Sequence, residues 1–345
     1  MTASLLPRRA ARRGKVACIA AAWLLAGCVA ITPHAKPHFD LEAHRGGRGL
    51  APENTLAAFS NAIDLGVTTL ELDIGLTADG VVVISHDTAL NPDHTRDAGG
   101  QWLAPKSSAT IRSLTLAQLQ TYDVGRLNPA SNYGKQFALQ QPRDGERMPT
   151  LAALFAQVKA RGDVAAGVVR FNIETKVDPT KPDETAAPEP MVRALLAEID
   201  KAGMAGRVTV QSFDWRTLAL VGQLAPQLPR AYITTARTLK DSRWTAGLDA
   251  SRFGSVPQMV KAAAGAAGTA PVIWSPAYAD LTPAAIQEAQ KLGMKVLPWT
   301  VNQRADMLRL MDAGADGIIT DYPDELRDLM RERGLSLPFP GKPQP

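Results

Sequence analysis

The feature that most constrains the fold is a repeated alternation of helix-like and strand-like segments over the second half of the chain. Amphipathic helical patterns are expected over 150–161, 188–202, 214–224, 282–292, 303–312 and 323–333. Short apolar runs typical of buried strands separate or precede them at 168–174, 207–212, 230–234, 271–275, 294–300 and 316–320. Strands that alternate with helices pair in parallel, so the sequence predicts an α/β fold.

The first half adds three strand candidates at 39–43, 67–74 and 81–85, with a helix over 54–65 that Gly66 ends. Nine strand candidates then compete for eight places in an irregular TIM (β/α)8 barrel. The connection from 74 to 81 is too short for a helical crossover, so we expect the irregularity there. A doubly wound open sheet is the alternative, but no GxGxxG phosphate loop supports it.

Two stretches interrupt the alternation and are predicted to be inserts. Residues 88–148, after the third strand, are rich in Asn, Pro, Asp, Gly and Gln, with one helical stretch at 115–121. Residues 236–268 form the second irregular stretch. We expect the first insert to stand over one face of the barrel, and the sequence leaves the role of both inserts open.

The N-terminus has the build of a secretory signal, because a basic stretch precedes an apolar run at 16–26. That run is too short to span a bilayer as a helix. It ends in Leu24-Leu25-Ala26-Gly27-Cys28, which resembles the lipobox of bacterial lipoproteins. The resemblance implies cleavage before Cys28 and lipidation of its thiol. An ordinary signal peptide with an incidental cysteine is the alternative.

This organisation assigns 1–27 to a lipoprotein signal peptide, 28–37 to a tether, 38–335 to the barrel and 336–345 to a C-terminal tail. The expected location is the periplasm, with the lipid holding the protein to a bacterial membrane. Val29 favours the outer membrane, because it is not the aspartate typical of inner-membrane retention.

Charge and cysteine content change once the signal is set aside. Residues 1–27 contain five basic residues and no acidic one, so their removal lowers the net charge from +4 to −1. The basic character of the whole chain therefore gives no reason to expect a nucleic-acid partner. Of the two cysteines, Cys18 leaves with the signal and Cys28 would carry lipid. No disulfide is expected, and stability must come from the core.

Candidate functional residues, most of them polar or charged, lie at or just after the C-terminal ends of the predicted strands, where barrels collect their functional groups. These residues are His44, Glu71, Asp73, His86, Glu174, Lys176, Gln211, Phe213, Trp299 and Asp321. Glu71 and Asp73 are two residues apart, so a strand projects both to one face. Buried charges are costly unless they are paired or bind a metal. Three carboxylates at one barrel mouth therefore predict a site for a hard divalent cation, Mg²⁺ or Ca²⁺.

Several of these residues and their neighbours in the sequence also have a purely structural interpretation. His44 could be a buried core histidine, and Arg45 could simply pair with Glu53. Asp87 could form a turn or orient the histidine before it, and Trp299 could pack in the core. The convergence of several polar groups at strand ends favours a functional site over these separate explanations.

The chain resembles the glycerophosphodiester phosphodiesterases from about His44 to Pro323. The resemblance rests on short motifs in the order of that family: His44-Arg45-Gly46, Pro52-Glu53-Asn54-Thr55, Glu71-Leu72-Asp73, the Thr77–Gly80 turn, Val83-Ile84-Ser85-His86-Asp87, Asn172-Ile173-Glu174-Thr175-Lys176, Gln211-Ser212-Phe213-Asp214, Trp299-Thr300-Val301-Asn302 and Asp316-Gly317-Ile318-Ile319-Thr320-Asp321. The two inserts depart from the family pattern and leave the substrate range open.

The resemblance implies an enzyme, a phosphoric diester hydrolase that converts a glycerophosphodiester to glycerol 3-phosphate and an alcohol. Its implied site consists of the acid/base pair His44 and His86, the metal ligands Glu71, Asp73 and Glu174, and the substrate-binding residues Arg45, Lys176, Phe213 and Trp299. The implied cofactor is one divalent cation. Ca²⁺ is favoured over Mg²⁺ because the expected location is extracytoplasmic. Which histidine is the acid stays open, and the nucleophile is either water or a substrate hydroxyl.

Two other functions are weighed against this one. A phospholipase C- or D-like enzyme would act on intact lipid, but it needs an apolar rim at the mouth, whereas 88–148 is mostly polar. A non-catalytic, lipid-anchored binding protein would keep the barrel only as a scaffold, and would not need both histidines and all three carboxylates. The head group of the substrate and the oligomeric state are not predicted.

Overall fold

The computed structural model of the 345-residue chain describes residues 1–2, 38–105, 109–265 and 270–341. The chain divides into Met1–Ala35 and a compact unit, Lys36–Pro345, which contains all elements described below. Cys28, the tether and nearly all of the predicted signal lie outside the described residues, so the predicted lipid anchor stays a prediction. Among the described residues, no helix combines the length and the apolar character needed to cross a membrane.

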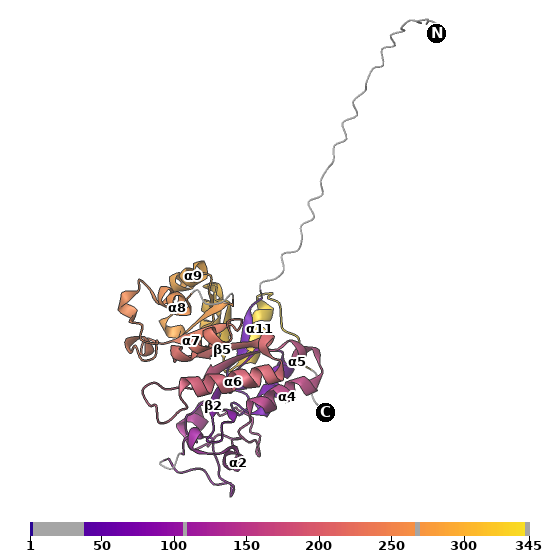
Figure 1. Cartoon of the computed structure of the whole chain (residues 1–345). Helices are drawn as coiled ribbons and strands as arrows, with labels where there is room; N and C mark the ends of the chain where they lie inside the picture. The colour runs from indigo at the N-terminus through magenta and orange to yellow at the C-terminus, as the bar shows by residue number, and fades with distance from the viewer. Residues whose placement is uncertain (3–37, 106–108, 266–269, 342–345) are drawn as a thin grey trace, which may run out of the picture. The chain divides into compact units, whose positions relative to one another are not determined.

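Eight parallel strands form the centre of the compact unit (Figure 1). In chain order they are β1 (Asp40–Ala43), β2 (Thr69–Leu76), β4 (Arg170–Thr175), β5 (Val208–Ser212), β6 (Arg230–Thr234), β7 (Val272–Pro276), β8 (Lys295–Val296) and β9 (Gly317–Thr320). From β1 to β8, neighbours in this order pair with each other, and β9 pairs with β1. Backbone bonds from Asp316 N to Val296 O and from Ile319 N to Pro298 O, both 3.0 Å, link the β8 and β9 segments. The nearly closed ring confirms the predicted barrel.

The ninth strand candidate, β3 (Val82–Ile84), lies off the barrel and pairs antiparallel with β2. The Thr77–Gly80 turn joins the two strands, and Gly80 adopts the left-handed φ of +77° that this turn needs. A connection this short can only form a hairpin. The expectation that His86 ends a barrel strand was therefore wrong. The hairpin instead brings the chain back to the middle of β2, where Ser85 N donates to Asp73 O at 3.0 Å.

Helices surround the strands (Figure 1), and each contributes buried apolar side chains to the main core. They are α1 (Leu56–Leu65), α4 (Leu151–Arg161), the short α5 (Val164–Val168), α6 (Pro188–Ala202), α7 (Trp215–Leu224), α8 (Val256–Ala264), α9 (Pro283–Lys291), α10 (Arg304–Asp312) and α11 (Pro323–Glu332). Their ends follow local rules. Thr55 caps α1 by accepting from Ala58 N at 3.1 Å, and Gly66 ends it with φ +82°.

The predicted insert at 236–268 was wrong in its second half. That half contains α8, the barrel helix between β6 and β7. Ser255 caps this helix, Pro257 lies in its first turn, and Met259 and Val260 are fully buried. The Ala- and Gly-rich sequence that follows weakens the helical periodicity, which is why the pattern read as irregular. Only the first half is irregular, with two 3-10 turns, Thr238–Lys240 and Ala250–Arg252.

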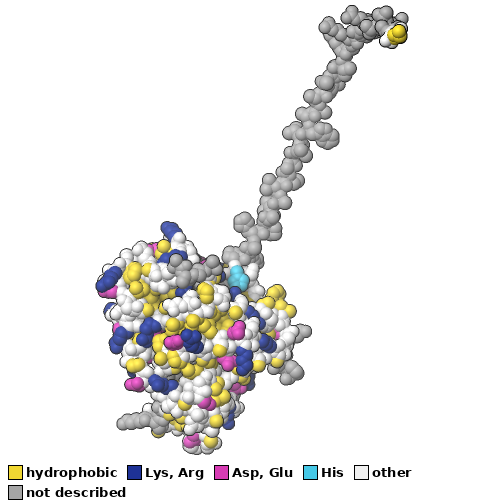
Figure 2. All heavy atoms as spheres, in the orientation of Figure 1, with side chains coloured by type: hydrophobic (Ala, Val, Ile, Leu, Met, Phe, Trp, Pro, Cys, Tyr) yellow, Lys and Arg dark blue, Asp and Glu magenta, His cyan; other side chains and the backbone are white. Residues whose placement is uncertain are grey.

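The described part of insert 88–148 contains a 3-10 turn (Ile111–Ser113) and the short helices α2 (Leu116–Leu119) and α3 (Asn132–Gln136). It has a small apolar cluster of its own, formed by Val83, Leu90, Ile111, Leu119 and Met148. Because Val83 belongs to β3, this cluster ties the insert to the hairpin. Elsewhere on the unit, the face shown in Figure 2 has basic and acidic side chains interspersed.

Candidate active site

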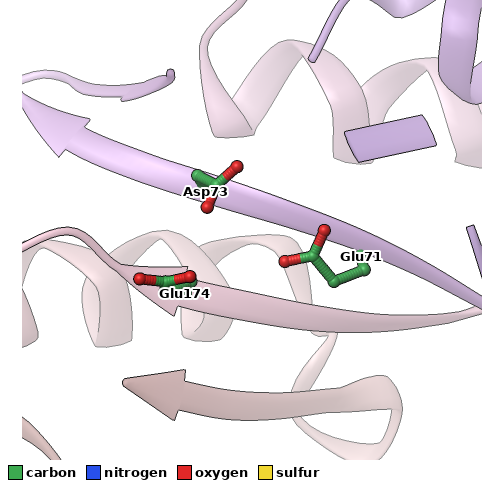
Figure 3. A group of neighbouring side chains, drawn as sticks. All are labelled: Glu71, Asp73 and Glu174. Carbon is green, nitrogen blue, oxygen red and sulfur yellow. The ribbon is translucent and has the colours of Figure 1, made fainter. Parts of the chain in front are cut away.

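Alternation along β2 separates its side chains into two sets. Leu70, Leu72 and Ile74 belong to the main apolar core, while Glu71 and Asp73 point to the opposite face of the strand. In the parallel pairing of β2 with β4, Asp73 lies opposite Glu174. One oxygen from each of the three carboxylates lies within 4.8 Å of the others, and all three residues are buried (Figure 3). The predicted metal ligands are thus brought together.

Fixed donors orient these carboxylates. Glu71 accepts from Gln211 Nε2 at 2.6 Å and from the backbone N of Arg45 at 2.9 Å. Asp73 accepts from Asn54 Nδ2 at 3.0 Å. The Lys176 ammonium lies 2.8 Å from Glu174 Oε1 and 3.6 Å from Asp73 Oδ1. The oxygens are therefore held by neighbours that leave part of their acceptor capacity unused.

The surroundings of this cluster disfavour the ionised forms of Glu71 and Glu174. Burial, followed by the charge of Asp73, raises the pKa of Glu71 well above its usual range. Burial raises the pKa of Glu174 to about 7, although Lys176 opposes the shift. Burial also disfavours ionised Asp73, but Lys176, His86 and Arg45 outweigh it and lower its pKa. A group of three buried oxygen ligands short of positive charge fits a hard divalent cation.

His44 follows β1 and is held by Asp321, which follows β9. The His44 Nδ1 lies 2.6 Å from Asp321 Oδ1, and Arg48 Nε and Asn302 Nδ2 donate to the same carboxylate at 2.7 Å each. Burial lowers the pKa of His44 to about 4, although Asp321 pulls it upward. The imidazole is therefore neutral at pH 7. With Nδ1 donating to Asp321, its lone pair is at Nε2.

His86 has a similar arrangement in a different part of the chain. Its Nδ1 lies 2.9 Å from Asp87 Oδ1, and burial together with the charges of Lys176 and Arg45 lowers its pKa. Asn91 Nδ2 holds the other oxygen of Asp87 at 2.6 Å. The interpretation of Asp87 as the group that orients His86 matches this geometry. Each histidine is thus fixed through Nδ1 by a carboxylate.

Arg45 owes its place to an unusual loop after β1. It has a left-handed φ of +52°, and the next residue, Gly46, has φ +80°. A Cβ on Gly46 would lie 2.9 Å from Ala58 Cβ, so glycine allows the loop to pack on α1. Arg45 Nη1 donates to Glu53 at 2.7 Å, and its Nε lies 3.4 Å from Asp73. The structural ion pair with Glu53 therefore exists, and Arg45 still faces the cavity.

A cavity of about 120 Å³ opens between these groups. Its lining includes His44, Arg45, Arg48, Glu71, His86, Glu174, Lys176, Gln211, Phe213 and Trp299. The rings of Phe213 and Trp299 pack edge to face at 5.4 Å, and Trp299 Nε1 donates to Ser275 O at 3.0 Å. The structure thus brings every described residue predicted for the site to this cavity or, for Asp73, beside its lining.

Sequence reasoning missed several supporting residues. Gln211 and Asp321 were predicted to lie at strand ends, but no role was assigned to them. Asn54 and Asn302 belong to motifs that resemble the family, but no role at the site was assigned to them either. Arg48 and Tyr133 gave no signal, because one lies in a loop and the other in the insert. Their contacts depend on how distant segments meet, which no local pattern shows.

Comparisons with known proteins place the chain in a family. The Glycerophosphoryl diester phosphodiesterase family matches residues 44–325. A glycerophosphodiester phosphodiesterase of Caldanaerobacter subterraneus subsp. tengcongensis is 28% identical over 298 residues, which cover 85% of this chain and 98% of that protein. A glycerophosphodiester phosphodiesterase of Bacillus subtilis is 29% identical over 289 residues, covering 82% and 83% of the two chains.

Solved structures give the same result. A family structure from Silicibacter pomeroyi DSS-3 has a TM-score of 0.77 and 35% identity, over 87% of this chain and 97% of that one. An Oleispira antarctica phosphodiesterase, solved with the product sn-glycerol-3-phosphate, has a TM-score of 0.61 and 23% identity, over 86% and 97%, and shows the shared fold. Fold and site define a barrel hydrolase with a buried acidic triad that could bind a metal ion. The chain belongs to the glycerophosphoryl diester phosphodiesterase family, which confirms the enzyme class that the motifs implied.

The raised pKa values of Glu71 and Glu174 predict how pH changes cation binding. Raised carboxyl pKa values stabilise the cation-free fold below about pH 4.5, and this contribution is lost as pH rises through about 7. A cation needs ionised carboxylates, so its effect grows over the same range. We expect saturating Ca²⁺ or Mg²⁺ to raise the melting temperature by about 5 °C at pH 8 and by much less at pH 5.

The measurement is thermal unfolding with and without cation at each pH. The lowered pKa of His44 has the opposite effect on stability, favouring the fold as pH rises from about 4 to 6.5. To first order this effect cancels in the difference between the two conditions. A cation effect that is equal at pH 5 and pH 8 would contradict the assigned ligands.

Proposed function

We propose that this protein hydrolyses glycerophosphodiesters to sn-glycerol 3-phosphate and an alcohol, with one divalent cation held by Glu71, Asp73 and Glu174. One observation carries the proposal: two carboxylate-fixed histidines and two members of a buried triad of carboxylates line the same small cavity. The names of the relatives support the substrate class. The product seen in the Oleispira antarctica structure suggests sn-glycerol 3-phosphate as the probe.

A cation bound at the three carboxylates would supply positive charge for the phosphoryl oxygens, where negative charge grows during attack. Arg45 and Lys176 add fixed positive charge on the same cavity. Both are also needed to balance the buried carboxylates, since Arg45 pairs with Glu53 and Lys176 with Glu174. They therefore bind the phosphate from positions that are already fixed before substrate arrives.

His44 and His86 transfer the protons. One neutral imidazole removes a proton from the attacking hydroxyl through Nε2, and the other, protonated, gives one to the departing alkoxide. The bond from phosphorus to the alcohol oxygen breaks as the bond to the attacking oxygen forms. The attacking group is water, or first the neighbouring hydroxyl of the glycerol, whose cyclic phosphate water then opens. Asp321 and Asp87 stabilise whichever imidazole is charged.

The lining of the cavity argues for a small diester over an intact lipid, because most of its side chains are polar or charged. Phe213 and Trp299 provide an apolar wall for a glycerol carbon chain. This favours the phosphodiesterase over the phospholipase alternative, and the fixed histidines and carboxylates favour an enzyme over a scaffold.

The cation and the location form part of the same proposal. The signal-like segment and Cys28 support a periplasmic enzyme attached by lipid, with Val29 favouring the outer membrane. Free Ca²⁺ is plentiful outside the cytoplasm, so we propose Ca²⁺ as the working ion, with Mg²⁺ as the alternative of the same ligand type.

Chelation tests the proposal directly. We expect the protein to release sn-glycerol 3-phosphate from glycerophosphocholine, to lose this activity in EDTA, and to regain it with Ca²⁺ or Mg²⁺. An enzyme-coupled assay for glycerol 3-phosphate measures the release. Folded protein that hydrolyses intact phosphatidylcholine and not glycerophosphocholine would support the phospholipase hypothesis.

Substitution of the histidines tests their role. His44→Ala or His86→Ala should each lower kcat by about 10²–10⁴-fold, because each removes one proton-transfer group. The cation-induced rise in melting temperature should persist, since neither histidine is a proposed ligand. His38→Ala is the matched control, because His38 is exposed and does not line the cavity. Turnover near that of the control in both variants would remove the histidines from the mechanism.

A further inference from the structure

The insert at 88–148 contacts the site at two places. Asn91 and His94 approach Asp87, the partner of His86, with Asn91 Nδ2 at 2.6 Å and His94 Nε2 at 3.5 Å. On the other side, Tyr133 of α3 contacts the loop after β1. The insert therefore contributes to the site, because its side chains contact residues that hold the proposed catalytic groups.

The Tyr133 hydroxyl joins two chains of contacts. It donates to Glu53, whose other oxygen accepts from Arg45 Nη1 at 2.7 Å. It also accepts from Arg48 Nη1 at 3.0 Å. Arg48 in turn donates to the Asp321 carboxylate that holds His44. The Tyr133 hydroxyl thus links Arg45, the proposed phosphate-binding arginine, with Asp321, the carboxylate that holds His44.

The surroundings fix this hydroxyl in place. The Tyr133 ring packs edge to face on Phe137 at 5.3 Å, and the Arg48 guanidinium lies 5.1 Å from the Phe137 ring centre. Gln140 Nε2 donates to Arg48 O at 2.7 Å, which ties the loop to the insert again. The ring and its partners are held from several directions, so loss of the hydroxyl alone leaves the packing intact.

The hydrogen bond from Tyr133 to Glu53 matters energetically because the Glu53 carboxylate is buried. Glu53 is 7% exposed, and although burial disfavours its charge, Arg45, His94 and Arg48 lower its pKa to about 2. A buried, ionised carboxylate requires all its donors, because an unpaired oxygen bears the cost of lost hydration. Without the Tyr133 hydroxyl, one oxygen of Glu53 loses its donor. The Glu53 carboxylate would then reorient, and the Arg45 guanidinium that it holds would move with it.

We propose that Tyr133 is a positioning residue that sets Arg45 relative to His44 through Glu53 and Arg48. The proposal rests on the proposed function, since it assumes that Arg45 binds the phosphate and that His44 transfers a proton. It assigns a role to the insert: α3 holds two separate parts of the site in a common geometry.

The test is Tyr133→Phe, which keeps the ring and removes the hydroxyl. We expect the dissociation constant for sn-glycerol 3-phosphate to rise about tenfold in calorimetry with cation present, with an unchanged stoichiometry. Tyr122→Phe is the matched control, because Tyr122 lies in the same insert and packs against its apolar cluster. A purely structural role predicts a lower stoichiometry with an unchanged dissociation constant, and this result would overturn the proposal.

A double-mutant cycle tests the route. If Tyr133 acts in part through Glu53, the loss of kcat/KM caused by Tyr133→Phe should be smaller when Glu53→Gln is already present than in the wild-type protein. Fully additive effects would overturn the route through Glu53. The wild-type protein separates the two proposals. If it neither binds nor hydrolyses, the proposed function fails and this inference with it. If the wild-type protein binds and hydrolyses, and Tyr133→Phe has the same dissociation constant and the same kcat/KM, only the positioning role fails.

Discussion

The pairing of β2 with β4 is the constraint on which the rest of the site depends. It sets Asp73 opposite Glu174 and leaves Glu71 on the same face two residues earlier. Three carboxylates in a buried position repel each other and lose hydration, which destabilises the fold unless positive charge and donors compensate. Lys176, Arg45, Asn54 and Gln211 surround them for this reason. A shift of one residue in either strand would turn the carboxylates into the apolar core.

The two histidines approach this centre by unrelated routes. His44 follows β1 directly, as barrel geometry favours. His86 is returned by the antiparallel β3, because the four-residue turn after β2 reverses the chain. Both nevertheless have a carboxylate on Nδ1, which fixes the ring and leaves Nε2 for chemistry. Burial lowers the pKa of both imidazoles, so the proposed base would act in its neutral form, and the proposed acid would first have to gain a proton.

Local patterns predicted much of this arrangement. The alternation of Leu70, Glu71, Leu72 and Asp73 gives both the strand and its polar face. Gly66 ends α1 as expected, and the helix begins after Thr55, within the predicted range. The short connection after β2 indicated an irregularity at this point, but strand propensity, which carries no direction, did not identify β3 as the strand outside the barrel. Local patterns also missed α8, whose Ala- and Gly-rich end hides its period, and Tyr133, whose partners lie 80 or more residues away in the chain.

The measurement that tests the central claim most directly is the anomalous diffraction of crystals grown with Mn²⁺, a cation with similar oxygen ligands. The account predicts one strong peak within bonding distance of Glu71, Asp73 and Glu174, and its loss in Asp73→Ala. A peak bound elsewhere, or at the histidines alone, would contradict the assignment of the three carboxylates as the cation site.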